Sequence, residues 1–398
     1  MKKKIIYSLL VVLVSLVGCE IGDNSSADPS ESFLRIFDTN EFEADFTPLD
    51  LAETPDGGFL VLSGIRRDDS NFLGVHVLKT DEFGTFVSET VLDPSFVNPV
   101  DQLVEINGLY YFFCMNEFQE ARLFSMDTSG IVQDPIAVNA VTYPSYLTAS
   151  DQNLLLLSYD NDDKRTILSE ISTDGSLLRS QGFGIGAGVG VEEPIIDHFT
   201  RTGRQLPFFA GVMENGTFFF NGFVNFTISM IFTRLDGAEP SGILQGQQDD
   251  GAMSRAIPIS GGRFAASRFN FGDNYYIPSV NIEANGITSS TDLAGNPILE
   301  LESDAPVVIE EVEVEGVRSL IFGSNTKDGQ ILISAYSEET GELNGIQFIG
   351  FSSPYELADI TTTEDGGIAV LSRVFIAGRF PRIAVNKISV DELRVLVQ

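Results

Sequence analysis

The stretch Thr54-Pro-Asp-Gly-Gly-Phe-Leu-Val-Leu-Ser63 returns near the far end of the chain as Thr363-Glu-Asp-Gly-Gly-Ile-Ala-Val-Leu-Ser372, with seven of ten positions identical. Asp-Gly-Gly followed by an apolar, β-prone run indicates a tight turn that leads into a strand. Glycine accepts the positive φ angles of hairpin turns, and aspartate can hydrogen-bond its own backbone there. Two such similar copies so far apart indicate an internal repeat.

Weaker versions of this turn lie between the two copies, at Asn107-Gly108, Asp151-Gln-Asn153, Thr202-Gly203, Gly261-Gly262 and Glu315-Gly316. From Gly57 to Gly366 the step averages about 51 residues. A second turn follows each first turn by 22 to 26 residues in six repeats and by 34 in the fourth. Its positions are Asp81-Glu-Phe-Gly84, Asp127-Thr-Ser-Gly130, Asp174-Gly175, Asp236-Gly237, Asn285-Gly286, Glu338-Glu-Thr-Gly341 and Val390-Asp391-Glu392.

Two turn signals that keep phase predict an all-β chain, a seven-bladed β-propeller of four-stranded antiparallel blades over residues 33–398. Six or eight blades are also compatible with the spacing. In the first blade the strands are expected at residues 49–53, 59–64, 74–79 and 85–92, and no amphipathic helix is expected anywhere. A closed ring buries both faces of every blade, which a single blade cannot do. The alternative, two stacked β-sandwich domains, explains the strands but not the phased turns.

The repeat resembles bacterial propeller repeats that carry a Thr-x-Asp-Gly-Gly-apolar hairpin. This resemblance implies an architecture and no particular activity. Two segments are candidates for closing the ring, because each can supply an outer strand of the last blade. They are Phe33-Leu-Arg-Ile-Phe37 and Leu393-Arg-Val-Leu-Val-Gln398, and the sequence leaves the choice open.

The N-terminus has the pattern of an export signal, with three lysines, an apolar run at residues 5–17, and then Gly18-Cys19. It resembles the lipobox of bacterial lipoproteins. That resemblance implies a signal peptide at residues 1–18, cleavage between Gly18 and Cys19, and lipidation of Cys19, which anchors the chain to the membrane. Residues 19–32 are small, polar and acidic and are expected to form a disordered tether.

Acidic residues after the cysteine resemble the export signal of surface lipoproteins in the Bacteroidota, although Ile21 and Gly22 interrupt them. The resemblance implies an outer-membrane lipoprotein, and it leaves surface-exposed and periplasm-facing locations open. The chain carries 57 Asp and Glu against 24 Lys and Arg, for a net charge of −33. This balance disfavours nucleic acid as a partner, because phosphate neutralisation needs clustered lysine and arginine. Cys114, in an apolar run, is expected to be buried and free of a disulfide.

Binding is expected on the side of the ring opposite the glycine turns, where the loops between second and third strands and the blade linkers gather. The Asp-Gly-Gly turns themselves are expected to touch no ligand. The candidate residues on the loop face are Asp68, Asp69, Asp160, Asp162, Asp163, Phe219 and Phe223.

Asp160-Asn-Asp-Asp163 offers oxygen ligands but lacks the glycine and the distal glutamate of a calcium loop, so a solvated turn is expected. No cofactor or metal is therefore predicted. A Ca²⁺ site would require Asp68, Asp69 or Asp273 to converge on it from other blades. In the longer fourth repeat, Asn215 to Phe226 predicts an extra hairpin, whose phenylalanines either pack under the loop face or project as a contact patch.

The run at residues 182–190 contains G-x-G-x-x-A, formally a dinucleotide fingerprint, but that motif requires a following helix in a βαβ unit. No helix is expected there, and the run is interpreted as a linker between blades. His76 and His198, the two histidines, are far apart in the sequence and are expected to be structural. Tryptophan is absent, which excludes the Asp-box of sialidase propellers.

These features predict a lipid-anchored cell-envelope propeller that acts as a non-catalytic binding or scaffold protein for a glycan, a peptide or an envelope protein. One alternative is a carboxylate-dependent glycan hydrolase or lyase. Another is a structural subunit of an outer-membrane assembly. Perturbed carboxylates that converge on the ring axis would favour an enzyme. An aromatic patch around residues 218–226 would favour a protein partner, and a featureless acidic funnel would favour a scaffold.

Overall fold

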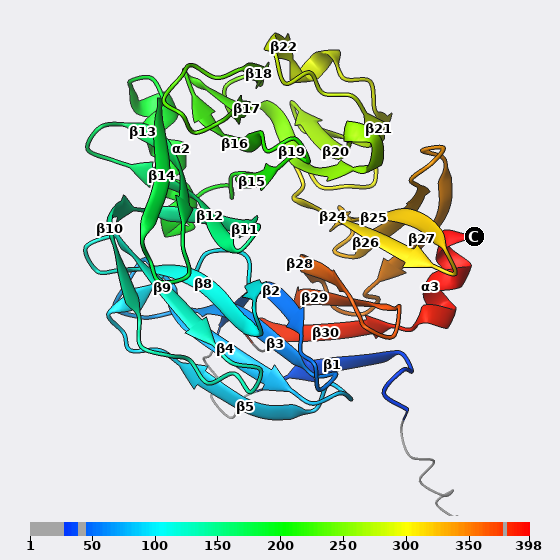
Figure 1. The fold of residues 1–398 in the computed structure, drawn as a ribbon. Coiled ribbons are helices and arrows are strands. Elements are labelled where there is room, and N and C mark those ends of the chain that lie inside the picture. The colour runs from blue at the N-terminus through cyan, green and yellow to red at the C-terminus, as the bar shows by residue number, and fades with distance from the viewer. Residues whose placement is uncertain (1–27, 39–44, 377–379) are drawn as a thin grey trace, which may run out of the picture.

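Antiparallel β-sheets follow one another around a ring in the computed structural model, which describes residues 28–38, 45–376 and 380–398 (Figure 1). The sheets are built from four-stranded meanders, so the molecule is a β-propeller. The largest sheet contains two such meanders, β2 to β5 and β7 to β10, which the short strand β6 joins by pairing with β4 and β8. Because β6 merges these units into one sheet, the number of seven blades remains a prediction.

The strands of the first half of the ring, and the two helices, have the following bounds. They are β1 (Phe33–Phe37), β2 (Phe46–Glu53), β3 (Phe59–Ile65), β4 (Gly74–Thr80), β5 (Phe86–Val91), β6 (Phe96–Val97), β7 (Val104–Ile106), β8 (Leu109–Asn116), β9 (Glu120–Met126), β10 (Ile136–Thr142), β11 (Pro144–Ser150), β12 (Asn153–Asp160), β13 (Arg165–Ile171), β14 (Leu177–Gly184), α2 (Val189–Thr200) and α3 (Val390–Val397).

The second half of the ring contains the remaining strands and two short 3-10 helices. They are β15 (Phe209–Val212), β16 (Phe218–Val224), β17 (Thr227–Thr233), β18 (Gly242–Gln245), β19 (Gly251–Ile259), η1 (Ser260–Gly262), β20 (Arg263–Asn270), β21 (Asp273–Val280), β22 (Gly286–Ser289), η2 (Ser290–Asp292), β23 (Asn296–Pro297), β24 (Val307–Val314), β25 (Val317–Asn325), β26 (Ile331–Ser337), β27 (Leu343–Ile349), β28 (Tyr355–Thr362), β29 (Ile368–Val374) and β30 (Arg382–Ile388).

The N-terminal strand closes the ring. β1 pairs antiparallel with β30, from Phe33 opposite Lys387 to Phe37 opposite Ile383, and so becomes the outer strand of the sheet β1-β30-β29-β28. The phenylalanines at both ends of β1 pack against a core shared by the first and last blades. The structure thus decides between the two closing segments that the sequence left open.

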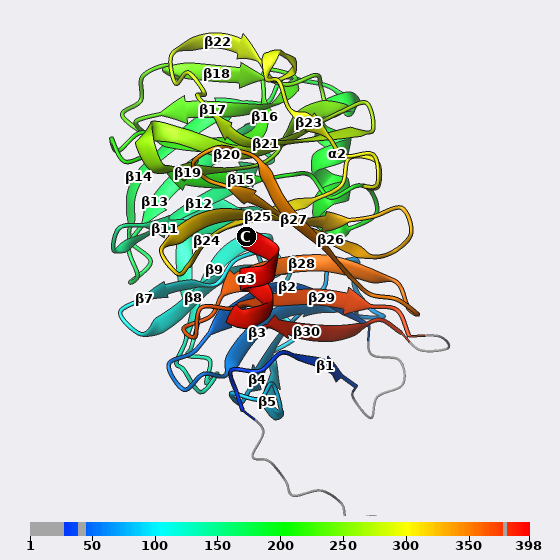
Figure 2. The same ribbon diagram turned by 90° about the vertical axis from the view of Figure 1, so that its right-hand side faces the viewer.

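The C-terminal segment is helical, which corrects both the turn expected at residues 390–392 and the outer strand considered at residues 393–398. α3 replaces the turn expected at residues 390–392, and it packs against β27 (Figure 2). Ser389 caps the helix by accepting a hydrogen bond from the backbone N–H of Glu392 at 3.4 Å. Leu393, Leu396 and Val397, at helical spacing, are buried.

A second helix, α2, follows β14, so the expectation that the chain contains no helix is wrong here too. Val191, Ile195 and Phe199 recur every four residues and form its buried stripe. The glycines before it and Pro194 inside it obscured this period in the sequence. α2 still does not complete a dinucleotide fold, because β14 lies in an antiparallel sheet and the next strand, β15, pairs antiparallel with β16.

The fourth repeat is regular once its first turn is placed correctly. That turn is Asn215-Gly216, where Gly216 has φ 76° and joins β15 to β16, whereas Thr202-Gly203 follows α2. The lag to Gly237 is then 237 − 216 = 21 residues instead of 34. The predicted extra hairpin is therefore wrong, since its phenylalanines belong to β16, a strand of the blade itself.

The two Asp-Gly-Gly hairpins are each held by a buried lysine. Lys79 of β4 donates to Thr54 Oγ1 at 2.6 Å and to Asp56 Oδ1 at 2.9 Å. Lys387 of β30 donates to Asp365 Oδ2 at 2.5 Å in the second copy. Burial alone would raise the pKa of Asp56, but the hydrogen bonds from Thr54 and Lys79 outweigh it and lower the pKa to about 2.

The two glycines of the first hairpin are required for different reasons. Gly57 has φ 76°, a conformation that side chains rarely adopt. A Cβ on Gly58 would lie 2.2 Å from the carbonyl oxygen of Thr80, so this position needs glycine for close approach to the neighbouring strand.

Part of the predicted tether is ordered. Lys387 Nζ donates to the carbonyl oxygen of Pro29 at 2.8 Å, and the backbone N–H of Ser389 donates to Ser32 Oγ at 2.9 Å. The predicted signal peptide and Cys19 lie outside the described residues. Within the described ranges, neither helix has the length and apolar character that crossing a bilayer requires.

Replacing Lys387 by methionine should lower the free energy of unfolding by about 3 kcal/mol, because Asp365 and the Pro29 carbonyl both lose a buried partner. Urea denaturation followed by tyrosine fluorescence measures this. Lys327→Met, at an exposed lysine that bonds one carbonyl, is the matched control. Equal urea midpoints for the two variants would show that the buried lysine does not hold the hairpin.

Candidate functional site

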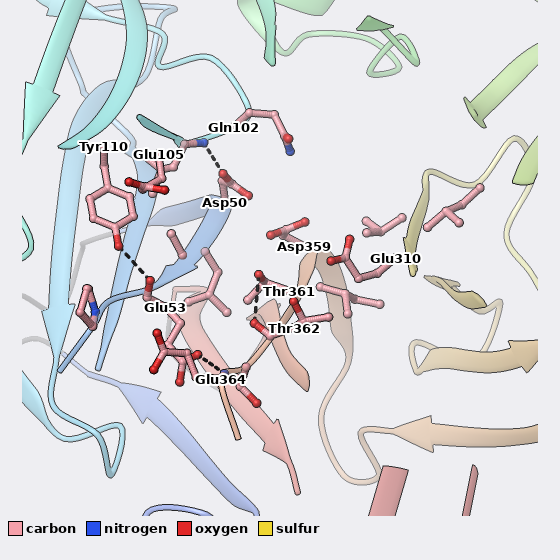
Figure 3. Close-up of a pocket in the computed structure, with 18 of the residues that line it drawn as sticks. Asp50, Glu53, Gln102, Glu105, Tyr110, Glu310, Asp359, Thr361, Thr362 and Glu364 are labelled. Carbon is pink, nitrogen blue, oxygen red and sulfur yellow. Dashed lines mark hydrogen bonds between the residues drawn. The ribbon is translucent and has the colours of Figure 1, made fainter. Parts of the chain in front are cut away.

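A cavity of about 570 Å³ lies at the ring axis, on the side where the Asp-Gly-Gly hairpins turn (Figure 3). Its wall includes the residues that flank those turns, Glu53 and Pro55 in one copy and Thr363 and Glu364 in the other. Six carboxyl groups line it, namely Asp50, Glu53, Glu105, Glu310, Asp359 and Glu364, together with one cation, Arg255. This acidic cavity thus lies on the side of the ring where no ligand contact was expected.

A β-bulge in the innermost strand precedes each of the deepest side chains. The pairing register shifts between Pro48 and Asp50 in β2, and between Leu357 and Asp359 in β28. The same shift precedes Arg255 in β19 and Tyr146 in β11. A bulge inserts one unpaired residue and re-aims the side chain that follows it. In four blades, such a bulge brings a polar side chain to the axis.

Asp50 and Asp359 come from neighbouring blades and share a hydrogen bond between their carboxyl groups. Both side chains are buried, with 5% and 8% of their surface exposed. Burial raises the pKa of Asp50 well above its usual value, and the charge of Asp359 raises it further. Asp50 also accepts a hydrogen bond from the backbone N–H of Leu103. We infer that Asp50 holds the proton that the pair shares at neutral pH.

Glu310, on β24, completes the buried acid group, and Figure 3 shows Asp359 between Asp50 and Glu310. Burial raises the pKa of Glu310 to about 7, and burial together with the charge of Glu310 raises the pKa of Asp359 to about 6. Arg255 stabilises the charged forms of both acids. Around neutral pH the floor of the cavity is therefore partly protonated and can both donate and accept hydrogen bonds.

The rim of the cavity joins the two hairpin copies. Glu53 of the first copy accepts a hydrogen bond from the backbone N–H of Glu364, in the second copy, at 2.5 Å. Tyr110 donates its hydroxyl proton to the carbonyl oxygen of Glu53 at 2.9 Å. The side chains of Glu105 and Glu364 are exposed. The rim therefore carries negative charge above a floor of carboxyl groups that hold protons.

This arrangement favours hydroxyl-rich or cationic ligand groups. Carboxylates accept hydrogen bonds, and protonated carboxyls also donate them, which matches the hydroxyl groups of a sugar. An anionic ligand would face repulsion from the rim with one arginine to offset it. The buried acid pair is also the kind of group that acid–base catalysis uses.

The acidic loop residues predicted from the sequence remain in separate loops. Asp68 and Asp69 lie between β3 and β4, where Asp69 accepts hydrogen bonds from Arg67 at 3.0 and 2.9 Å. Asp160 caps its own turn by accepting from the backbone N–H groups of Asp162 and Asp163. Within residues 28–38, 45–376 and 380–398, no group of three or more His, Cys, Asp or Glu side chains is arranged to hold a metal ion.

The two candidate phenylalanines, Phe219 and Phe223, are buried core residues with 1% and 0% exposure. The prediction that they project as a contact patch is wrong, and packing inside the blade is the correct alternative. Cys114 is buried and free, as expected, and burial raises the pKa of its thiol.

His76 is structural in spite of a suggestive set of neighbours. Its Nδ1 lies 2.7 Å from Ser63 Oγ, and its Nε2 lies 3.1 Å from Glu89. Ser63 is fully buried, so its hydroxyl is not exposed at the surface.

Reasoning from the sequence missed the axial acids, although a signal for them exists. Asp50 precedes Gly57 by seven residues, and Asp359 precedes Gly366 by seven. The repeat therefore extends upstream of the ten quoted positions to include an aspartate. Arg255 stands at the same distance before Gly262. The bulges that turn these positions toward the axis have no recognisable sequence signature.

The architecture defines a β-propeller protein with an acidic axial cavity. No protein-family model and no curated protein matches the chain. Among solved structures it is similar to the β-propeller domain of the Trilobed protease from Pyrococcus furiosus, at 9% identity over 89% of this chain and 98% of that one, with a TM-score of 0.48. It is also similar to the AfRom2 CNH domain, at 11% identity over 89% and 98% of the two chains, with a TM-score of 0.49.

A sialidase from Trypanosoma rangeli, solved in complex with the inhibitor DANA, is similar at 9% identity over 89% of this chain and 56% of that chain, with a TM-score of 0.46. The chain spans about half the length of the sialidase structures it matches. At such low identity the likeness concerns the fold and not the activity.

The shared proton at the axis predicts an unusual pH dependence. Folding raises the pKa of Asp359 from 3.8 to about 6, so the folded chain binds more protons than the unfolded chain between those pH values. The stability that Asp359 contributes is therefore present below about pH 4 and is lost as the pH rises toward 6. Asp359→Asn cannot titrate and should not show this loss. Its free energy of unfolding, relative to that of the wild type, should therefore rise by roughly 2 kcal/mol between pH 4 and pH 7.

Urea denaturation of both proteins at several pH values between 4 and 7.5 measures the difference. Glu313→Gln, at an exposed acid outside the cavity, controls for the change in net charge. If the difference between Asp359→Asn and wild type stayed constant with pH, Asp359 would not titrate in this range.

Proposed function

We propose that this protein is a lipid-anchored propeller of the cell envelope that binds a glycan in its acidic axial cavity. The observation that carries the proposal is the cavity itself, in which carboxyl groups from several blades converge on one ligand-sized space. A wall of carboxyl groups with raised pKa values matches sugar hydroxyl groups, and the negative rim disfavours acidic sugars. The Gly18-Cys19 pattern supports the lipid anchor.

The position of Pro29 supports an orientation on the membrane. Pro29 contacts Lys387, which holds the hairpin of the last blade, so the chain leaves the body on the hairpin side. Eight residues lie between Cys19 and Asp28. Fully extended, they span roughly 30 Å. A body tethered this closely would present the acidic cavity toward the membrane surface, whether in the periplasm or outside the cell, and its loop face away from it.

Binding to an array of neutral, amino-bearing and acidic oligosaccharides tests the ligand class. Neutral or amino-bearing oligosaccharides should bind, and acidic ones should not. Glu364→Arg, which reverses a charge at the rim, should weaken the binding of an amino-bearing oligosaccharide at least tenfold. Glu313→Arg, at an exposed acid outside the cavity, is the matched control. Preferred binding of acidic glycans, or equal effects of the two variants, would contradict the proposal.

A glycan hydrolase is the second candidate, because Asp50 and Asp359 share a proton beside a third acid, Glu310. Mass spectrometry of each bound oligosaccharide after incubation with the protein separates the two functions. An unchanged oligosaccharide supports binding alone. Shortened products that disappear with Asp359→Asn would replace the binding proposal with the hydrolase.

The lipid anchor has a test of its own. Cys19→Ser should abolish incorporation of labelled palmitate and should move the protein from the membrane fraction to the soluble fraction of the cell envelope. Cys114→Ser, at the buried cysteine, should leave both unchanged. Membrane association that survived Cys19→Ser would mean that the chain is held by another contact.

A further inference from the structure

A second, smaller cavity of about 170 Å³ lies near the axis on the opposite side of the ring, among the connections between blades. It shares Gln102, Arg255, Val308 and Asp359 with the acidic cavity. The chain after α2, including Arg201 and Arg204, forms one wall. This wall belongs to the segment between β14 and β15 that contains α2, and α2 lies on the right-hand side of Figure 2.

This cavity differs from the first in having as many arginines as acids, since Asp101, Asp304 and Asp359 also line it. Three arginines line it, Arg201, Arg204 and Arg255. Arg204 is already committed, because its guanidinium donates to Asp304 at 2.8 Å and to the carbonyl oxygen of Asp249. Asp304 also accepts the backbone N–H of Gly272 at 3.0 Å. The Arg204–Asp304 pair has no net charge, so Arg201 and Arg255 are the two arginines that can bind a ligand.

Arg201 is held in place but has little to bind. It caps α2 in a left-handed conformation, with φ 52°, which fixes where its side chain starts. The side chain is 25% exposed, and its one ionic contact is Asp101 at 4.0 Å. Its Nε is buried without a hydrogen-bond partner. Burial and the nearby Arg373 lower the pKa of the Arg201 guanidinium, as expected for a poorly compensated charge.

Arg255 reaches the same cavity from the bulge in β19. One of its terminal nitrogens donates to the hydroxyl of Tyr146 at 2.5 Å, and the guanidinium lies 5.2 Å from the centre of that ring. Its Nε is also buried without a partner. Two guanidinium groups with unused N–H donors therefore line one cavity.

His198 adds a neutral donor to this wall. Its Nδ1 accepts a hydrogen bond from the backbone N–H of Leu206 at 3.0 Å, which places the ring proton on Nε2. Burial and the nearby Arg201 lower the pKa of His198 to about 3, so the ring stays neutral at physiological pH. The ring packs against Phe208 and Phe199 and is fixed in orientation.

We propose that this second cavity binds a carboxylate group of a ligand through Arg201 and Arg255. Arg204 is paired with Asp304, and Arg201 and Arg255 face the carboxyl groups of Asp101 and Asp359. The Nε atoms of both arginines nevertheless lack a hydrogen-bond partner, so both can donate to a ligand. A planar guanidinium matches a carboxylate in a two-pronged geometry. The volume suits a small acidic group and excludes a polymer.

Acetate is the probe for this site, titrated into the full-length protein at pH 7.5 against chloride at constant ionic strength. Isothermal titration calorimetry and thermal unfolding should both detect acetate binding. Arg201→Gln should weaken acetate at least tenfold. Arg318→Gln, at an exposed arginine with ionic contacts of 3.7 to 3.9 Å, should not change it.

Asp101→Asn is the decisive variant, because it removes the one carboxylate that faces Arg201 and should strengthen acetate binding several-fold. Misfolding could not produce such a gain. Equal responses to acetate and chloride in the wild type, or no gain with Asp101→Asn, would overturn the proposal. The glycan experiment uses a different cavity and a different variant, so either proposal can fail without the other.

Discussion

The pairing of β1 with β30 joins the first described strand of the chain to its last blade. A blade is a thin sheet with two apolar faces, and neither face can be buried unless a neighbour stands on each side. β1 supplies the outer strand of the last blade, and its phenylalanines enter a core that also contains Phe59 and Val61 of the first blade and Leu371 and Val385 of the last. Every other interface in the ring depends on this closure.

Closure also brings the two Asp-Gly-Gly copies side by side. They are the most similar repeats in sequence, and they sit in adjacent blades, where Glu53 of one accepts the backbone N–H of Glu364 of the other. Each copy has its own buried lysine, Lys79 or Lys387, that neutralises the turn aspartate. The same adjacency puts Asp50 beside Asp359, because each precedes its turn by the same number of residues. A structural repeat thus generates an acidic pair at the axis.

The two cavities differ in their balance of charged groups. Six carboxyl groups and one arginine line the hairpin side, whereas three arginines and three aspartates line the side of the blade connections, and both cavities share Arg255 and Asp359. The β-bulges make this possible, because an ordinary strand would alternate its side chains strictly between two faces. A bulge lets Leu49 and Asp50, or Ala358 and Asp359, reach consecutive parts of the axial wall. The placement of polar side chains on both sides of the ring follows from an irregularity of the inner strands.

Much of the fold could be predicted from the sequence, because turns and strands are encoded locally. Glycine at positive φ, aspartate that bonds its own backbone and alternating apolar runs located the strands of the first blade to within a few residues. The burial of Cys114 also followed from its neighbours. The helices were missed where Gly188, Gly190 and Pro194 obscured the period of α2, and where an acidic N-terminal turn, at Asp391 and Glu392, looked like a loop.

The sequence by itself determined the repeated β-hairpin, its phase and the all-β class, because these depend on conformational preferences of neighbouring residues. Only the tertiary structure decided which terminus closes the ring, that Phe219 and Phe223 are core, and that the acids gather at the axis. Those outcomes depend on pairings between residues as far apart as Phe33 and Lys387 and on bulges set by packing. The residues that flank the quoted Asp-Gly-Gly turns form the rim of the acidic axial cavity.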